Sequence, residues 1–359
     1  MTHRILVGSY SRSVSTLVFD PAASALSVLA SVEVGHHPSW LARHPADPAL
    51  AYTGLEQADG CMLALRVDAA GRAAVVARAG AGGADPASFA ALAGELIVGN
   101  YSSGNVAILP TAAAPPSIAP EPSAVHVLPF AVPGPNAARQ EASHPHQVVH
   151  DAARDVLLVP DLGADRTWIF SHEPDTKAWA RTGVLEYAPG AGPRHLLVHG
   201  DFVYTLCELD STVTTHRYGG SALPISRAST MFDPPNPLGD MLAAEIAFYP
   251  PPPPPSSSRS VELYTPRFLY VSNRNHPGPS GDLLAIFSLE DATAPALSVE
   301  IPTGLKHVRG LAVAPDGRWV IVGGAQGGGV KVLEVTGGGK GLREVAMCAL
   351  EAPTSFLWL

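Results

Sequence analysis

Charged side chains recur at one position of a segment that repeats along the sequence. His146, Arg194, Glu245 and Arg309 each stand one residue after the start of a copy. A histidine can carry a proton near neutral pH, and an arginine can bind a carboxylate or phosphate through two parallel hydrogen bonds. The other copies carry smaller side chains at this position: Ser39, Ala87 and Thr354.

A second set of polar residues follows the hydrophobic stretch in the middle of each copy. Tyr101, Glu208 and Arg274 end three of these stretches, and Gln326 lies within a residue of the end of another. Only 15% of the chain is charged, so two aligned columns of charge indicate a site rather than coincidence. Charges gathered in a partly dry place must pair with one another or with a ligand.

These residue types predict an anionic substrate and one proton-transfer group. We expect Arg194 and Arg274 to hold the anionic group and the oxygen that gains charge during the reaction. His146 is the predicted proton carrier, and Glu208 either orients it or acts as the base itself. The predicted secondary substrate contacts are Tyr101, Glu245, Arg309 and Gln326.

The other histidines show no comparable pattern of partners. His144 lies two residues before His146 and competes with it for the catalytic role. We expect most of the others at surface or packing positions, namely His36, His37, His150, His195 and His199.

Neither a serine-hydrolase nor a zinc-hydrolase route is predicted. The sequence contains no GxSxG turn and no HExxH pair. We therefore expect no cofactor and no bound metal, although Glu208 and Glu245 could share a cation.

The repeat itself predicts the fold that positions these residues. Each copy has a Pro or small residue, a short apolar strand, a turn, a β-rich strand, a polar loop and a further strand. The copies start at Pro38, Pro86, Pro145, Pro193, Ala244, Val308 and Pro353, so they are 48, 59, 48, 51, 64 and 45 residues apart. This period is typical of a four-stranded propeller blade. The sequence predicts an all-β protein with seven four-stranded blades, forming one domain over residues 1–359.

The last copy, PTSFLWL, ends at the chain terminus without its remaining strands. The N-terminal stretch RILVGSYSRSVSTLVFD has the pattern of those missing strands. We therefore expect both ends of the chain to complete one blade, which would remove free sheet edges.

Two Pro-rich segments interrupt the repeat, at about residues 110–144 and 249–266. Proline cannot donate to a sheet ladder, so the first is expected to be an edge strand followed by a long loop. The second contains six consecutive prolines and is interpreted as an exposed, dispensable insertion at residues 250–259. A role as an SH3-type ligand is the less favoured alternative.

Composition excludes several classes of protein. The net charge is -9, whereas nucleic-acid binding requires a basic face. No stretch has the length or composition of a membrane span or a secretory signal. Cys61, Cys207 and Cys348 form no pair pattern, which fits a reducing compartment. We expect a cytoplasmic protein without a nucleic-acid or membrane partner, and its oligomeric state stays open.

Several segments resemble the seven-bladed lactonase family. They include GAGPRH, CELDS and SNRN, together with the more generic turn VAPDGR. The family includes the propeller-type 6-phosphogluconolactonases and the fungal 3-carboxy-cis,cis-muconate lactonizing enzymes. The resemblance implies a site of one His, two Arg and one Glu, at His146, Arg194, Glu208 and Arg274. It also implies a small anionic lactone or carboxylate as substrate.

The resemblance leaves the reaction open. The segments GAGPRH and CELDS favour hydrolysis of the 6-phosphogluconolactone type, which is the function we predict. The Pro-rich insertions favour a fungal chain and, with it, cyclisation of a carboxymuconate. A non-enzymatic interaction propeller is a third possibility, although such proteins have uncharged channels and charged rims.

Overall fold

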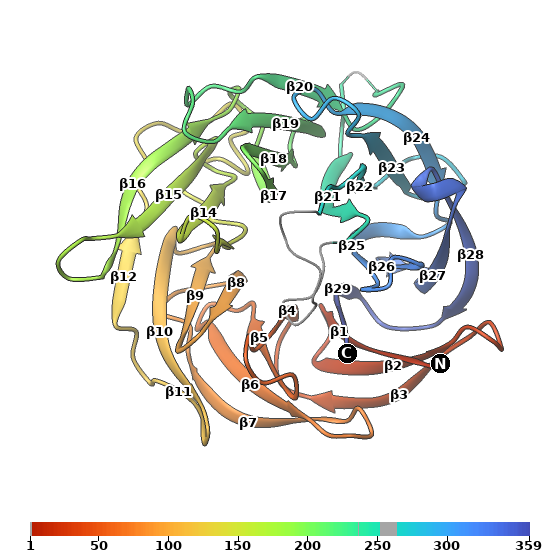
Figure 1. The fold of residues 1–359 in the computed structure, drawn as a ribbon, viewed down its shortest axis with the longest axis horizontal. Helices are drawn as coiled ribbons and strands as arrows, with labels where there is room; N and C mark the ends of the chain where they lie inside the picture. Colours follow the sequence, from red (N-terminus) through yellow and green to blue (C-terminus); the bar gives the residue numbers. More distant parts are fainter. Residues whose placement is uncertain (1, 236, 252–263) are drawn as a thin grey trace.

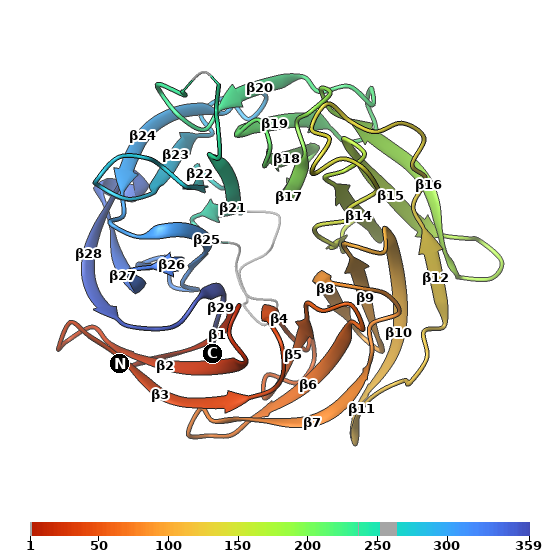
Figure 2. The ribbon, with the colours of Figure 1, turned by 180° about the vertical axis from the view of Figure 1, so that it is seen from behind.

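Seven antiparallel β-sheets surround a central axis in the computed structural model (Figure 1). The structure describes residues 2–235, 237–251 and 264–359. Viewed from the opposite side, the same seven sheets form a closed ring of blades (Figure 2). The predicted all-β, seven-bladed β-propeller is confirmed.

Each blade runs from an innermost strand at the axis to an outermost strand at the rim. The innermost strands are β4 (Pro38–Arg43), β8 (Pro86–Leu92), β13 (Val149–Asp151), β17 (Pro193–His199), β21 (Leu242–Tyr249), β25 (Lys306–Val313) and β29 (Pro353–Trp358). The second strands are β1 (His3–Ser9), β5 (Leu50–Leu55), β9 (Glu95–Asn100), β14 (Val156–Asp161), β18 (Phe202–Cys207), β22 (Phe268–Arg274) and β26 (Trp319–Gly327).

The third strands and the outermost strands complete each blade. The third strands are β2 (Ser13–Asp20), β6 (Cys61–Val67), β10 (Asn105–Ala113), β15 (Arg166–His172), β19 (Thr212–Arg217), β23 (Leu283–Ser288) and β27 (Gly329–Thr336). The outermost strands are β3 (Ala25–Glu33), β7 (Ala73–Gly80), β11 (Pro116–Ile118), β12 (Ala124–Val127), β16 (Trp179–Glu186), β20 (Ser226–Ser229), β24 (Ala296–Pro302) and β28 (Gly341–Cys348). A 3₁₀ turn, η2 (Gly337–Gly339), joins β27 to β28.

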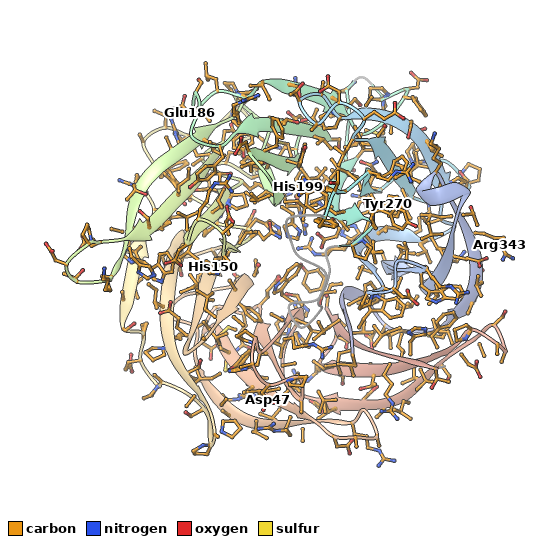
Figure 3. The ribbon with its side chains drawn as sticks, viewed as in Figure 1. Asp47, His150, Glu186, His199, Tyr270 and Arg343 are labelled. Carbon is orange, nitrogen blue, oxygen red and sulfur yellow. The ribbon has the colours of Figure 1, made fainter. Side chains whose placement is uncertain are left out.

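Apolar packing between neighbouring blades stabilises the ring. The second strands β5, β14 and β22 are buried along their whole length, as expected of strands covered on both faces. At the rim, Glu186 on β16 and Arg343 on β28 point outward from the ring (Figure 3). Burial is therefore greatest in the second strands, which hold the innermost strands around the channel.

Both ends of the chain form one blade, with the strand order β29-β1-β2-β3. Ile5 of β1 pairs with Trp358 of β29, and Val7 pairs with Phe356. Trp358 packs into a core cluster with Ile5 and residues of the neighbouring blade, including Ile321. The predicted closure by the two termini is confirmed.

The prediction of four strands in every blade is wrong for the blade that contains β8, β9 and β10. Its outer edge is divided into β11 and β12, which both pair with β10, at Thr111–Ala113 and at Asn105–Ile108. Pro120 and Pro122 lie between the two short strands. Because proline lacks an N–H group, one continuous edge strand cannot form there.

The two Pro-rich segments differ in how far they can be described. The first supplies β11, β12 and a long loop that leads to β13. The second begins at the end of β21 and includes residues 252–263, which lie outside the described residues. The predicted exposure and dispensability of residues 250–259 therefore stay a prediction.

Replacing Trp358 with Ala tests how much the closure of the ring by the two termini contributes to stability. Trp358 is buried at the seam between the first and last strands of the chain, so its removal leaves a cavity there. We expect a loss of about 3–5 kcal/mol in the free energy of unfolding, measured by chemical denaturation. The control is Val28→Ala on the exposed edge strand β3, which should change stability by less than about 0.5 kcal/mol. Equal losses of stability in the Trp358→Ala and Val28→Ala variants would contradict a structural role for the seam.

Candidate active site in the central channel

One cavity lies on the axis of the propeller and collects side chains from all seven innermost positions. The residues that follow the seven motif starts all line it. The lining residues are Ser39, Trp40, Glu56, Ala87, His146, Arg194, His195, Glu245, Arg309 and Thr354.

β-Bulges turn these side chains toward the axis. In β17, Pro193 pairs with Cys207 and His195 pairs with Leu206, so Arg194 is the extra residue. The same irregularity occurs in five other innermost strands, at Ser39, Ala87, Ala244–Glu245, Arg309 and Thr354. A bulge breaks the strict alternation of side chains between the two faces of a sheet. Consecutive residues such as Arg194 and His195 can therefore line the same cavity.

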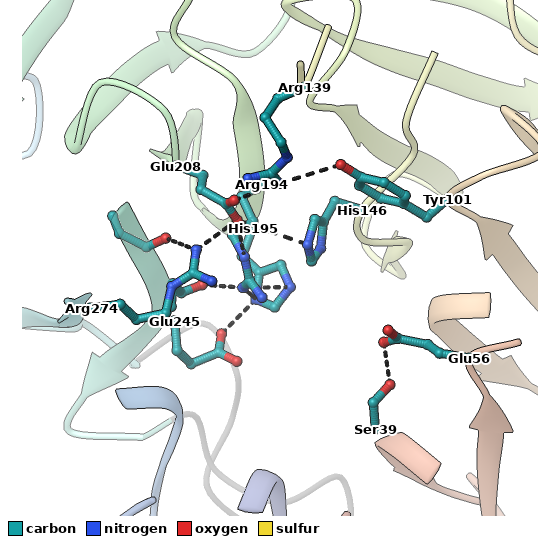
Figure 4. Close-up of polar contacts among 12 residues, drawn as sticks. Ser39, Glu56, Tyr101, Arg139, His146, Arg194, His195, Glu208, Glu245 and Arg274 are labelled. Atoms are coloured by element: carbon teal, nitrogen blue, oxygen red, sulfur yellow. Dashed lines mark hydrogen bonds and ion pairs between the residues drawn. The ribbon is translucent and has the colours of Figure 1, made fainter. Parts of the chain in front are cut away.

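Glu208 is the centre of the charged cluster (Figure 4). Its Oε2 accepts a hydrogen bond from Nε of Arg194 at 2.7 Å and forms an ion pair with Nη2 of Arg274 at 2.9 Å. Its Oε1 accepts a hydrogen bond from Nη2 of Arg139 at 2.7 Å. Nε2 of His146 lies 4.0 Å from Oε2. The structure thus brings the four predicted catalytic residues together around one carboxylate.

The arginines keep Glu208 ionised. The carboxylate is 1% exposed, and burial alone would raise its pKa. The guanidinium groups of Arg274, Arg194 and Arg139 outweigh burial and hold the pKa of Glu208 well below its usual value. A carboxylate bound in this way is a poor proton acceptor. Of the two roles predicted for Glu208, orientation fits the geometry better than general base.

His146 is a buried, neutral imidazole. Burial, together with the positive charge of Arg194, lowers its pKa well below the usual value. Among the described residues, its Nδ1 atom has no hydrogen-bond partner. A proton on Nε2 faces the Glu208 carboxylate, and this tautomer leaves the Nδ1 lone pair available. The neighbouring candidate His144 instead has both ring nitrogens engaged, by the Tyr101 carbonyl and by Glu141.

His195 is not a surface or ordinary packing residue, so the prediction for it is wrong. It is buried, and its Nδ1 lies 2.7 Å from Oε1 of Glu245. Its ring also lies 5.3 Å from the ring of His146 between centroids. Glu245 itself lines the cavity as predicted, but its described side-chain partner is this histidine.

The remaining predicted contacts differ in their placement. Arg309 lies over the ring of Tyr10, with 4.9 Å between its Cζ atom and the ring centroid. The hydroxyl of Tyr101 accepts a hydrogen bond from Arg139 at 3.3 Å. Gln326 is exposed on β26 and takes part in none of the cluster's contacts among the described residues. The prediction that Gln326 contacts substrate is therefore not supported by its position, because β26 turns it toward solvent.

A buried aspartate fixes the segment that carries His146. The Asp161 carboxylate accepts hydrogen bonds from the Ser143 hydroxyl, the His144 N–H and the Trp168 indole. The backbone N–H of His146 then donates to the Pro160 carbonyl at 2.9 Å. These bonds hold an otherwise irregular loop against β14.

The turn before β17 is fixed in a similar way. Asp165 accepts hydrogen bonds from the backbone N–H groups of Gly190 and Gly192. The N–H of Glu208 donates to the Gly192 carbonyl at 2.7 Å. Gly192 has a φ of 64°, a conformation that favours glycine. The GAGPRH and CELDS segments are thereby joined, with Arg194 and Glu208 facing each other.

The sequence reasoning missed Arg139, as well as Trp40 and Glu56, which line the cavity. Arg139 comes from the first Pro-rich segment, which the repeat pattern marks only as an interruption. Its neighbour Gln140 is fully buried and donates to the Leu162 carbonyl, which anchors the loop over the channel. With 33% of its side chain exposed, Arg139 is the most accessible of the three arginines on Glu208.

Comparison with known proteins identifies the family. Residues 4–358 match the family described as Lactonase, 7-bladed beta-propeller. This chain belongs to that family. The lactonase fold of the chain also resembles a protein from Bacteroides fragilis, with a TM-score of 0.84 and 23% identity over 100% of this chain and 98% of the other. The periplasmic gluconolactonase PpgL of Pseudomonas aeruginosa gives a TM-score of 0.78, with 23% identity over 100% and 99% of the two chains.

Similarity to curated lactonases is more limited in extent. The 6-phosphogluconolactonase of Serratia proteamaculans is 30% identical over 198 residues, which cover 53% of each chain. The chain spans about half the length of the curated relatives that it matches. The match supports a common family, and the activity of this chain must be argued from its own residues.

Two further findings concern metal ions and membranes. Within residues 2–235, 237–251 and 264–359, no group of three or more His, Cys, Asp or Glu residues could hold a metal ion. No helix in the same part of the chain is long and apolar enough to span a membrane. Metal independence and cytoplasmic location stay predictions, and one structural relative is a periplasmic protein.

Replacing Glu208 with Gln tests whether this carboxylate stabilises the cluster. The substitution leaves three guanidinium groups near one another without their shared anion. We expect a loss of about 3–5 kcal/mol in the free energy of unfolding, measured by chemical denaturation. The matched control is Glu334→Gln, which removes an exposed partner of Arg343 at the rim and should cost less than about 1 kcal/mol. A loss in E208Q no larger than the control would contradict the central role of Glu208.

Proposed function

We propose that this lactonase-family protein hydrolyses a small anionic lactone in the central channel, with 6-phosphogluconolactone as the first substrate to test. The observation that carries the proposal is the arginine cluster on Glu208 beside a neutral His146 with an unpartnered Nδ1. A relative named 6-phosphogluconolactonase, from Serratia proteamaculans, supports the choice of substrate.

The excess of positive charge supports an anionic substrate. Four arginines belong to the site, namely Arg139, Arg194, Arg274 and Arg309. Three carboxylates face them, from Glu56, Glu208 and Glu245. Burial and the positive neighbours lower the pKa values of His146 and His195, so both imidazoles are neutral. One positive charge is therefore left without a protein partner, and an anionic ligand would balance it.

His146 acts as the general base. Its Nδ1 takes a proton from a water molecule, and the water oxygen attacks the lactone carbonyl. The carbonyl oxygen gains negative charge as the tetrahedral intermediate forms. When the ring C–O bond breaks, the proton passes from His146 to the alkoxide that leaves. The product is the open-chain hydroxy acid, and His146 returns to its neutral form.

Arg194 and Arg274 stabilise the developing negative charge. No described residue forms a hydrogen bond with Nη2 of Arg194, and Nε of Arg274 is buried without a partner. Nη2 of Arg194 can therefore bind a ligand in the cavity, whereas Arg274, held by Glu208, contributes its positive charge. Because their positions are fixed before substrate arrives, little reorganisation is needed in the transition state.

A paired assay of the purified protein tests the proposal. It compares 6-phosphogluconolactone hydrolysis with 3-carboxymuconate cyclisation, after subtracting the rate without protein. We expect hydrolysis without added metal and no change on adding a chelator. Cyclisation alone would assign the chain to the muconate reaction. If the protein catalyses neither reaction, a non-enzymatic propeller is favoured. Loss of activity in the presence of a chelator would show that a metal is required.

His146→Ala should reduce turnover by roughly 10²–10⁴-fold, the usual contribution of one acid–base group. Arg194→Lys should also reduce turnover, because an ammonium group cannot reproduce the fixed geometry of the guanidinium. The control is Arg217→Lys, at an exposed position on β19, which should leave turnover unchanged. The measurement is steady-state kinetics, and full activity of H146A would exclude His146 as the base.

The pH dependence of kcat/KM should follow the protonation of His146. The base must be neutral, so activity falls as the pH falls through its pKa. Burial and then Arg194 lower that pKa, so the acid limb should lie below pH 6.5. Arg309 lowers the pKa further, and Arg309→Gln should therefore move the acid limb to higher pH. A limb unchanged in R309Q, or one above pH 6.5 in the wild type, would contradict this assignment.

A further inference from the structure

Arg194 rests on a buried pair formed by His195 and Glu245. Nδ1 of His195 lies 2.7 Å from Oε1 of Glu245, and Nε2 lies 3.1 Å from Nη1 of Arg194. Nη1 also donates to the carbonyl oxygen of Ala244. Figure 4 shows the resulting chain from Glu245 through His195 and Arg194 to Glu208. This chain joins the bulge of β17 to the bulge of β21.

Hydrogen-bond chemistry assigns the tautomer of His195. An ionised carboxylate can only accept, so Nδ1 carries the proton that Glu245 receives. Nη1 of Arg194 lies 3.1 Å from Nε2 and 3.3 Å from Nδ1, so the guanidinium rests against the face of the ring. A second proton on the ring would place a positive imidazolium in contact with the positive guanidinium. Burial lowers the pKa of His195 and Arg194 adds to this effect, against the opposing influence of Glu245.

We propose that His195, with its tautomer fixed by Glu245, is a positioning residue that orients Arg194 and directs its Nη2 toward the substrate. The proposal rests on the function proposed above, because it assigns to Arg194 a contact with the reacting anion. Nε of Arg194 is held by Glu208, and Nη1 is held by His195 and Ala244. Only Nη2 then remains to bind a ligand.

The competing role is that of a second proton carrier, which would donate to the ring oxygen as it leaves. That role requires a protonated His195. The guanidinium nitrogen Nη1 lies within 3.3 Å of both ring nitrogens, which opposes a positive ring. A positioning residue needs a neutral, planar group in contact with Arg194, whereas a proton carrier needs a titratable ring and benefits from the charge of Glu245.

Conservative substitutions, which keep part of each side chain, distinguish between these two roles. In Glu245→Gln, an amide oxygen can still accept from Nδ1–H. In His195→Gln, a neutral, planar amide that cannot titrate takes the place of the ring beside Arg194. We expect Glu245→Ala and His195→Ala to lower kcat/KM by roughly 10–100-fold, as for other residues that orient a functional group. The two Gln variants should lose much less.

The control for loss of a buried histidine is His216→Gln. His216 is fully buried on β19 and donates to the Glu186 carbonyl, outside the channel cavity. Its substitution should leave kcat/KM unchanged even if stability falls. Equal losses in the Gln and Ala variants at positions 195 and 245 would overturn the positioning role and favour proton transfer.

Two structural measurements test the inference without relying on activity. Nitrogen NMR of the imidazole rings should show His195 neutral and protonated on Nδ1 at neutral pH, with its signals assigned from H195Q. A crystal structure of H195A should show the Arg194 guanidinium displaced from its present contacts. A charged His195, a proton on Nε2, or an unmoved Arg194 would overturn the inference. If these results agree but no lactone is hydrolysed, the proposed function alone fails.

Discussion

The channel depends on one buried carboxylate. Glu208 is reached by arginines from β17, from the end of β22 and from the loop before β13. Without a shared anion, three guanidinium groups could not approach one another in a place from which water is largely excluded. The same ion pairs that permit this arrangement also fix the direction of each arginine. One interaction therefore determines both the stability of the centre and the atoms that remain free for a ligand.

The backbone reaches this arrangement through repeated bulges at the inner ends of the blades. A regular strand directs alternate residues to opposite faces, and could present only every second side chain to the axis. The extra residue at Arg194 allows His195 to face the same cavity, and the bulge at Ala244–Glu245 provides its partner. The small circumference of the channel thus holds more charged groups than regular strands would deliver. The strands behind them are wholly buried, as in β22, which holds these groups in register.

The sequence was sufficient to predict what the repeat encodes. The starts from Pro38 to Pro353 correspond to seven innermost strands, and the residue after each start lies at the cavity. The repeat could not predict Arg139, because this residue belongs to a loop that only one blade carries. The repeat also misled the interpretation of His195. In a regular strand, the residue after Arg194 would point to the opposite face of the sheet from Arg194. The divided edge strand was missed because it depends on where prolines fall in the segment that pairs with β10.

The electrostatics of the cluster link substrate binding to proton transfer. Arg194 sits beside Arg309 and Arg274, and burial together with these like charges lowers its pKa to about 9. Burial, and then the same positive field, lower the pKa of His146, so it is neutral and a weak base before substrate binds. An anion bound to the arginines cancels part of this field, so it raises the pKa of His146 toward its ordinary value. The base would then become stronger when the anionic substrate is present. A neutral lactone of the same shape would lack this effect, so discrimination between the two would extend from binding to the chemical step.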